Sequence, residues 1–237
     1  MFERYQFLNS EECRRTADAV HALRTHWEQR HAEAPFYTLG AASYLDATDP
    51  AARKKCYYDK AARLNPLLEK DFEWLYAKLS KSLAEHLGGA CAFERRAGRP
   101  GFHIFMPTPL FRQSIASIHV DLQYQLIDWR DHPHPDFEKP ISFTASIVLP
   151  RGGGGLHTWD IRYEKVRGLP IDEIAKRVHS TAPAVHRYVP GGMVVHSGHT
   201  VHQIAPMPDI EPGNPLDARI TLQGHAIRSE GTWWLYW

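Results

Sequence analysis

A histidine and an aspartate two residues apart have the types and spacing of metal ligands. They occur in the segment Ile118-His119-Val120-Asp121-Leu122. Side chains alternate between the two faces of a β-strand, so His119 and Asp121 would project from one face while the apolar residues pack on the other. The same spacing also occurs on exposed strands, so the pair alone does not predict a metal site.

Two later segments add groups that complete such a site. Three histidines stand at intervals of three, at His196, His199 and His202. Further on, strand alternation places Arg219 and Thr221 on one face of a single strand. Because an unpaired buried cation is costly, an arginine on the inward face of a strand predicts an anionic ligand beside it.

Together these motifs resemble the iron(II)- and 2-oxoglutarate-dependent dioxygenases, over roughly residues 101–228. The resemblance implies that His119 and Asp121 are the proximal iron ligands. It implies that His202 is the distal ligand, because His202 lies in an apolar-flanked strand over Val201–Ile204 and precedes the family's x-Ile-x-Pro pattern. His199 is the main alternative for the distal position.

The co-substrate and the reaction also follow from the resemblance. Two imidazoles and one carboxylate on one face of an octahedral iron leave positions for 2-oxoglutarate and O2. Arg219 is expected to bind the far carboxylate of 2-oxoglutarate, with the Thr221 hydroxyl beside it. The expected activity is hydroxylation of a small organic molecule, with release of succinate and CO2. The alternatives are desaturation, cyclisation or epimerisation at the same centre and, less favoured, a non-redox metal-dependent cupin or a jelly-roll binding module.

Several further residues are expected to contact the substrate or to neighbour the ligands, since they follow the first motif closely or fall on polar strand faces. These are Gln123, Tyr124, His103, Thr144 and His199.

The elements that must position these residues fall into two parts of the chain. Residues 1–100 predict a mostly helical buttress, with one helix from Ser10 and another from Asn65-Pro66 to Gly88-Gly89. Residues 101–228 predict the double-stranded β-helix, a jelly-roll, cupin-like core, that the resemblance implies, and the whole of 1–237 a single domain that is mainly β with flanking helices. The predicted strands are 102–105, 115–122, 141–149, 193–195, 201–204 and 218–227.

Composition narrows the possible partners and the compartment. The 237 residues carry 28 Lys and Arg against 27 Asp and Glu, so no basic surplus indicates nucleic-acid binding. No apolar run reaches the length of a membrane span, and the three cysteines form no CxxC pair. We therefore expect a cytoplasmic protein with a small-molecule substrate, without nucleic-acid or membrane partners, and the sequence leaves its oligomeric state open.

Overall fold

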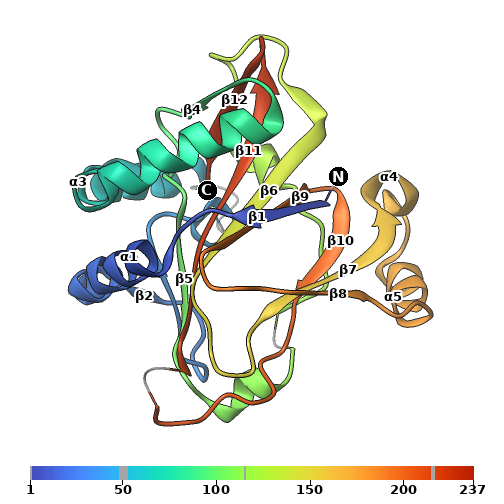
Figure 1. Cartoon of the computed structure of the whole chain (residues 1–237). Helices are drawn as coiled ribbons and strands as arrows, with labels where there is room; N and C mark the ends of the chain where they lie inside the picture. Colours follow the sequence, from blue (N-terminus) through green and yellow to red (C-terminus); the bar gives the residue numbers. More distant parts are fainter. Residues whose placement is uncertain (1, 48–52, 115, 215–216) are drawn as a thin grey trace.

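Two antiparallel sheets form the centre of the computed structural model, which describes residues 2–47, 53–114, 116–214 and 217–237. The larger sheet has the strand order β1-β9-β6-β11-β5-β3-β2, with β12 joined to β11 and β4 joined to β12. The smaller sheet has the order β10-β7-β8. Only the β12–β4 pairing among these strands is parallel. The mainly β core with flanking helices is therefore confirmed (Figure 1).

The strands of the two sheets come from all parts of the chain. Their bounds are β1 Phe2–Gln6, β2 Glu28–Gln29, β3 Phe36–Leu39, β4 Ala90–Phe93, β5 Gly101–Phe105, β6 Asp136–Val148, β7 Gly155–Arg162, β8 Ala184–Arg187, β9 Gly192–Ser197, β10 Thr200–Ile204, β11 Arg219–Ser229 and β12 Thr232–Tyr236. The helices are α1 Ser10–Ala22, α2 Ser43–Asp46, α3 Arg53–Leu87, α4 Tyr163–Val166 and α5 Ile171–His179, with short 3₁₀ helices η1 Arg24–His26, η2 Pro109–Arg112 and η3 Gln123–Leu126.

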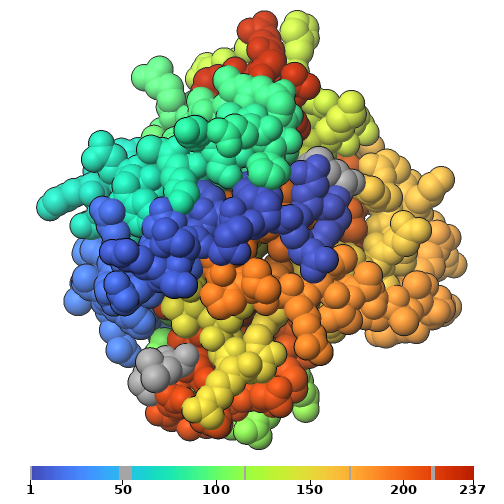
Figure 2. Space-filling view, in the orientation of Figure 1, coloured from blue at the N-terminus to red at the C-terminus, as the bar shows by residue number. Residues whose placement is uncertain are grey.

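The helices α1 and α3 cover one face of the larger sheet. Buried apolar residues of α3 pack with the inward face of β6 in one core cluster, and this face carries the predicted alternation of Ile141, Phe143, Ala145 and Ile147. In the space-filling view, the N-terminal segment and α3 form a continuous layer across the front of the molecule (Figure 2). The opposite face of β6 is thereby left for a cavity between the sheets.

The two predicted helices exist: α1 begins at Ser10, as predicted, although its cap lies one residue earlier than the sequence indicated, and α3 begins well before Asn65. Asn9, not Ser10, caps α1: its side chain accepts from the Glu12 amide while the Glu12 carboxylate accepts from the Asn9 amide. The helix predicted to start at Asn65-Pro66 already begins at Arg53 and departs from helical geometry at Phe72 (φ −122°, ψ 22°). The Asn65 carboxamide bonds the backbone of residues 97 and 99 instead of capping a helix.

The first hundred residues also contribute strands that their composition did not indicate. β1 pairs with β9, β3 pairs with β5, and β4 pairs with β12, so this part of the chain extends the sheet of the core. The shared sheet favours the single-domain organisation over 1–237, which stays a prediction. No helix in the described part of the chain combines the length and apolar composition needed to cross a membrane.

Candidate active site

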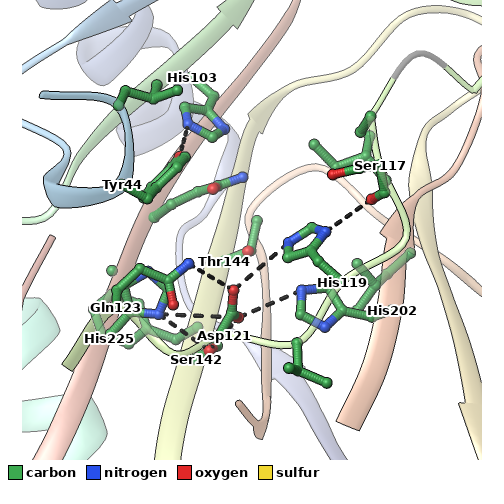
Figure 3. A pocket seen from close by; sticks show the side chains of 18 of the residues that line it. Tyr44, His103, Ser117, His119, Asp121, Gln123, Ser142, Thr144, His202 and His225 are labelled. Atoms are coloured by element: carbon green, nitrogen blue, oxygen red, sulfur yellow. Dashed lines mark hydrogen bonds and ion pairs between the residues drawn. The ribbon is translucent and has the colours of Figure 1, made fainter. Parts of the chain in front are cut away.

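A cavity of about 600 Å³ lies between the two sheets and holds most of the residues singled out from the sequence. Its lining includes His119, Asp121 and His202 together with Arg219 at the start of β11. Polar side chains of β6 and β11 form one wall, and the segment that carries the His-x-Asp motif crosses in front of them (Figure 3).

The segment 118–122 is not the strand that the sequence predicted; Ile115, where that prediction began, lies outside the described residues. Its one ladder contact is an isolated bridge in which the His119 amide donates to the His202 carbonyl at 3.0 Å and the His202 amide returns the bond at 2.8 Å. The Asp121 amide then donates to the Gly198 carbonyl at 2.7 Å. Backbone hydrogen bonds thus join the extended segment to the β9–β10 turn and to β10, the strand that carries His202.

The side chains of His119, Asp121 and His202 converge, with one ligand atom from each within 4.8 Å of the others. The His119 Nε2 atom lies 3.6 Å from Asp121 Oδ1, and the His202 Nε2 atom lies 3.4 Å from Asp121 Oδ2. Ligands about 2.1 Å from one metal ion and at right angles to each other are about 3 Å apart. The group therefore has the donor types and nearly the spacing of a two-histidine, one-carboxylate facial triad.

Hydrogen bonds to backbone carbonyls fix the tautomer of both histidines. The Nδ1 atom of His119 lies 2.8 Å from the Ser117 carbonyl oxygen, and Nδ1 of His202 lies 2.8 Å from the Thr200 carbonyl oxygen. A carbonyl oxygen only accepts, so each Nδ1 carries a proton and Nε2 is the ring nitrogen that faces Asp121. Nε2 is therefore the atom through which each ring would ligate a metal, a step that requires it to be unprotonated.

The Asp121 carboxylate is buried, and both of its oxygens accept hydrogen bonds. Gln123 Nε2 donates to Oδ1 at 2.8 Å, and Ser142 Oγ donates to Oδ2 at 2.5 Å. Burial alone would raise the pKa of Asp121, but the neighbouring histidines, His202 foremost, bring that pKa far below its usual range. Asp121 is therefore ionised in the fold and available as a ligand.

Burial holds the pKa of His202 down to about 3 and lowers the pKa values of His103, His196 and His225 as well. These histidines take up protons only on unfolding when the pH lies between their folded and unfolded pKa values. The contribution of His202 to the stability of the metal-free protein is thus complete above about pH 6.5 and is lost as the pH falls toward 3, and the other three histidines act in the same direction.

We expect the free energy of unfolding of the metal-free protein to fall as the pH drops below about 6.5, by up to about 1.4 kcal/mol per pH unit from His202, with the other three histidines adding to the decrease. Urea unfolding at a series of pH values measures this slope. Carboxylates with ordinary pKa values affect only the lower part of the range, near pH 4. A free energy that stays constant between pH 6.5 and 5 would contradict the neutral, buried state of these histidines.

Arg219 is fully buried, and within the described residues its guanidinium nitrogens make no hydrogen bond. Its guanidinium lies over the rings of Phe105 and Tyr188, at 5.3 and 5.4 Å from their centroids. Burial lowers the pKa of Arg219, and the adjacent Tyr188 opposes that shift. A buried cation at the wall of a cavity, with no carboxylate among the described residues paired to it, predicts an anionic ligand.

Thr221 is also fully buried, but it does not belong to the cavity lining, and its hydroxyl accepts a hydrogen bond from Gln223 Nε2 at 3.2 Å. Its expected contact with the co-substrate stays a prediction.

The remaining expected residues divide between two cavities. His103, Gln123 and Thr144 line the cavity that holds the triad. Tyr124 and His199 line a separate pocket behind η3. There, His199 Nδ1 lies 2.9 Å from a Glu164 carboxylate oxygen, and Nε2 lies 3.3 Å from the Tyr124 hydroxyl. Both ring nitrogens of His199 therefore have partners outside the triad.

Sequence reasoning missed several residues of the cavity. His225 lies on β11 beside Ser142, and the face that carries Arg219, Thr221 and Gln223 continues to it by the same alternation, so a signal was present. Tyr44, whose hydroxyl lies 2.5 Å from His103 Nε2, comes from α2, and Tyr188 follows β8. No local pattern marks these two, because only the tertiary fold brings them to the cavity.

The Gly198→Ala variant is expected to bind Fe(II) about tenfold more weakly, because displaced ligand partners typically cost 10–100-fold in metal affinity. A Cβ at Gly198 would lie 3.1 Å from the Asp121 carbonyl oxygen and 3.3 Å from Ser142 Oγ, which forces the Asp121 backbone away. Anaerobic Fe(II) titration measures the affinity. Gly154→Ala is the control, since its nearest neighbour lies at an ordinary 3.5 Å. Equal affinity of Gly198→Ala and wild type would show that this close approach does not position Asp121.

Comparison with known proteins identifies the fold. No protein-family model matches the sequence, and neither does any curated protein. Among solved structures, SnoN, a non-heme alpha-ketoglutarate-dependent epimerase from nogalamycin biosynthesis, is similar with a TM-score of 0.53 and 11% identity, over 97% of this chain and 81% of SnoN. SnoK, a non-heme alpha-ketoglutarate-dependent carbocyclase from the same biosynthesis, has a TM-score of 0.52 and 11% identity, over 95% and 78%.

AviO1 from Streptomyces viridochromogenes Tue57 is similar at the same level, with a TM-score of 0.52 and 14% identity over 97% of this chain and 90% of AviO1. These similarities confirm the predicted fold: the chain is a double-stranded β-helix of the kind found in iron(II)- and 2-oxoglutarate-dependent oxygenases.

Proposed function

We propose that this protein is an iron(II)- and 2-oxoglutarate-dependent oxygenase that hydroxylates a small organic molecule. The proposal rests on one cavity that holds both a two-histidine, one-carboxylate cluster and a buried arginine that has no ion pair with any described residue. The cluster has the ligand types for a metal cation, and the buried arginine requires an anion. The double-stranded β-helix fold supports the same reading.

The residues of the chain fit these two ligands. The Nε2 atoms of His119 and His202 and the Asp121 carboxylate would hold Fe(II), since their tautomers and ionisation already suit a divalent cation. Arg219 would bind the distal carboxylate of 2-oxoglutarate by a charge-assisted hydrogen bond. With both bound, iron and O2 supply the oxidation: 2-oxoglutarate becomes succinate and CO2 while a substrate C–H bond becomes C–OH.

The protein's own tasks are positioning and the exclusion of water. Gln123 and Ser142 hold the Asp121 carboxylate in one orientation. The rings of Phe105 and Tyr188 enclose the Arg219 guanidinium, which strengthens its attraction for an anion by keeping water away. The apolar side chains Phe36, Leu45 and Leu126 line other parts of the cavity and would surround the substrate.

Desaturation, cyclisation or epimerisation by the same residues is the second candidate. The specific observation for it is that SnoN and SnoK, whose fold is similar, are named as an epimerase and a carbocyclase. Hydroxylation adds one oxygen atom to the substrate mass, whereas epimerisation leaves the mass unchanged, so mass spectrometry of the product separates them. A non-redox cupin is less favoured, because it gives Arg219 no ligand.

The decisive test is turnover of 2-oxoglutarate by the purified protein. We expect Fe(II) to bind at about one ion per chain and, in the presence of O2, succinate to form in amounts that NMR detects, while Asp121→Ala forms none. Absence of both Fe(II) binding and succinate would refute the proposal.

The near-neutral charge and the free cysteines support a small-molecule enzyme of the cytoplasm.

A further inference from the structure

The geometry points to His225 as a positioning residue for the metal-binding carboxylate, acting on Asp121 through the Ser142 hydroxyl. The inference rests on the proposed metal site and adds a residue to it that lies outside the His-x-Asp…His motif. His225 is buried on β11 at the back of the cavity, on the side of Asp121 opposite His119 and His202 (Figure 3).

The direction of each hydrogen bond in this chain of residues is fixed. An ionised carboxylate only accepts, so Ser142 uses its single proton on Asp121 Oδ2, 2.5 Å away. Ser142 Oγ can then only accept from His225 Nδ1, which lies 3.1 Å away. The His225 Nδ1–H therefore orients the Ser142 hydroxyl, and the hydroxyl in turn holds Oδ2. This order holds whether the imidazole is neutral or protonated, since Nδ1 carries a proton in both cases.

The sheet provides a rigid support for this arrangement. Ser142 on β6 pairs directly with His225 on β11, and on its other side it pairs with His196 on β9. Of the two flanking imidazoles, only His225 bonds the hydroxyl, because His196 Nδ1 donates to the Ser197 carbonyl oxygen instead. His225 in turn pairs with Tyr236 of β12, and their ring centroids lie 5.5 Å apart.

The consequence for Asp121 is a carboxylate held on both oxygens. Gln123 binds Oδ1 and Ser142 binds Oδ2, so the carboxylate plane is fixed and its remaining lone pairs face His119 and His202. Without the His225 donor, the Ser142 hydroxyl can rotate toward other acceptors and Oδ2 loses its partner part of the time. The metal then has to order the carboxylate when it binds, which lowers affinity.

Substitutions that keep or remove the donor at the Nδ1 position separate this role from simple packing. The Nδ2 amide of asparagine occupies the place of histidine Nδ1, so His225→Asn keeps the donor, whereas His225→Leu fills the space without one. Co(II) serves as the probe, and both its dissociation constant and the visible absorption of its complex are measured. A thermal melt of each metal-free variant reports whether the protein is folded.

We expect His225→Leu to weaken Co(II) binding about tenfold and to shift the visible spectrum, while His225→Asn stays within about threefold of wild type. Ser142→Ala is expected to lose at least as much as His225→Leu. The double variant Ser142→Ala/His225→Leu should bind like Ser142→Ala alone, because the second residue acts through the first.

Three results would overturn the inference: wild-type Co(II) affinity in His225→Leu, equal losses in His225→Asn and His225→Leu, or additive losses in the double variant. Failure of the proposed function gives a different pattern, in which wild type itself binds no Co(II) or Asp121→Ala binds it as well as wild type does.

Discussion

The His202→Ala variant is expected to lose Fe(II) affinity by more than about 100-fold, since even the partners of metal ligands are worth 10–100-fold. The substitution removes one of the three groups that converge in the cavity, and the His202 Nε2 atom lies 3.4 Å from Asp121 Oδ2. The bridge between residues 119 and 202 is made by backbone atoms, so alanine leaves the position of His119 intact. Anaerobic Fe(II) titration of the variant measures the loss.

His199→Ala is the matched control, because His199 is a similarly buried histidine in the turn that leads from β9 into β10. Its ring is engaged by Glu164 and Tyr124 in the neighbouring pocket, so we expect its removal to spare Fe(II) affinity. If His199→Ala lost the metal while His202→Ala kept it, the distal assignment would be reversed.

Strand alternation is the reason why much of the core was predictable from the sequence. In β6, the apolar residues Ile141, Phe143 and Ala145 join the core, while Ser142 and Thr144 line the cavity, as the two-residue period indicates. In such a strand, the pattern is set by burial on one face, which is a local property of the sequence. β5, β9, β10 and β11 also overlap predicted strands.

Long-range pairing is the reason why other parts were not predictable. The segment 118–122 alternates like a strand, but among the described residues its pairing is limited to the single bridge to β10. β1 and β4 are strands because they pair with β9 and β12, which are distant in the sequence. No local pattern in β1 or β4 indicates this pairing. The prediction that His119 and Asp121 point to one side holds although 118–122 is not a paired strand. An extended backbone keeps side chains two residues apart on one side whether or not it is paired.

The second large effect that we expect is on the KM for 2-oxoglutarate, when the charge of Arg219 is removed. A charge-assisted hydrogen bond is worth about 1.5 to 3 kcal/mol, so Arg219→Met should raise the KM for 2-oxoglutarate by roughly 10- to 150-fold while leaving Fe(II) affinity near wild type. Succinate formation at increasing 2-oxoglutarate concentration measures KM. Arg228→Met is the control, since Arg228 lies on the same strand but is exposed, over the Trp233 ring and outside the cavity lining.

The same substitution should act in the opposite direction on the ligand-free protein. Arg219 is buried without an acceptor among the described residues, so its charge destabilises the fold until an anion arrives. Methionine keeps most of the apolar volume between Phe105 and Tyr188, and the melting temperature of ligand-free Arg219→Met should equal or exceed that of wild type. Added 2-oxoglutarate should then raise the melting temperature of wild type only. An unchanged KM, together with a lower melting temperature, would mean that Arg219 supports the fold and does not bind the co-substrate.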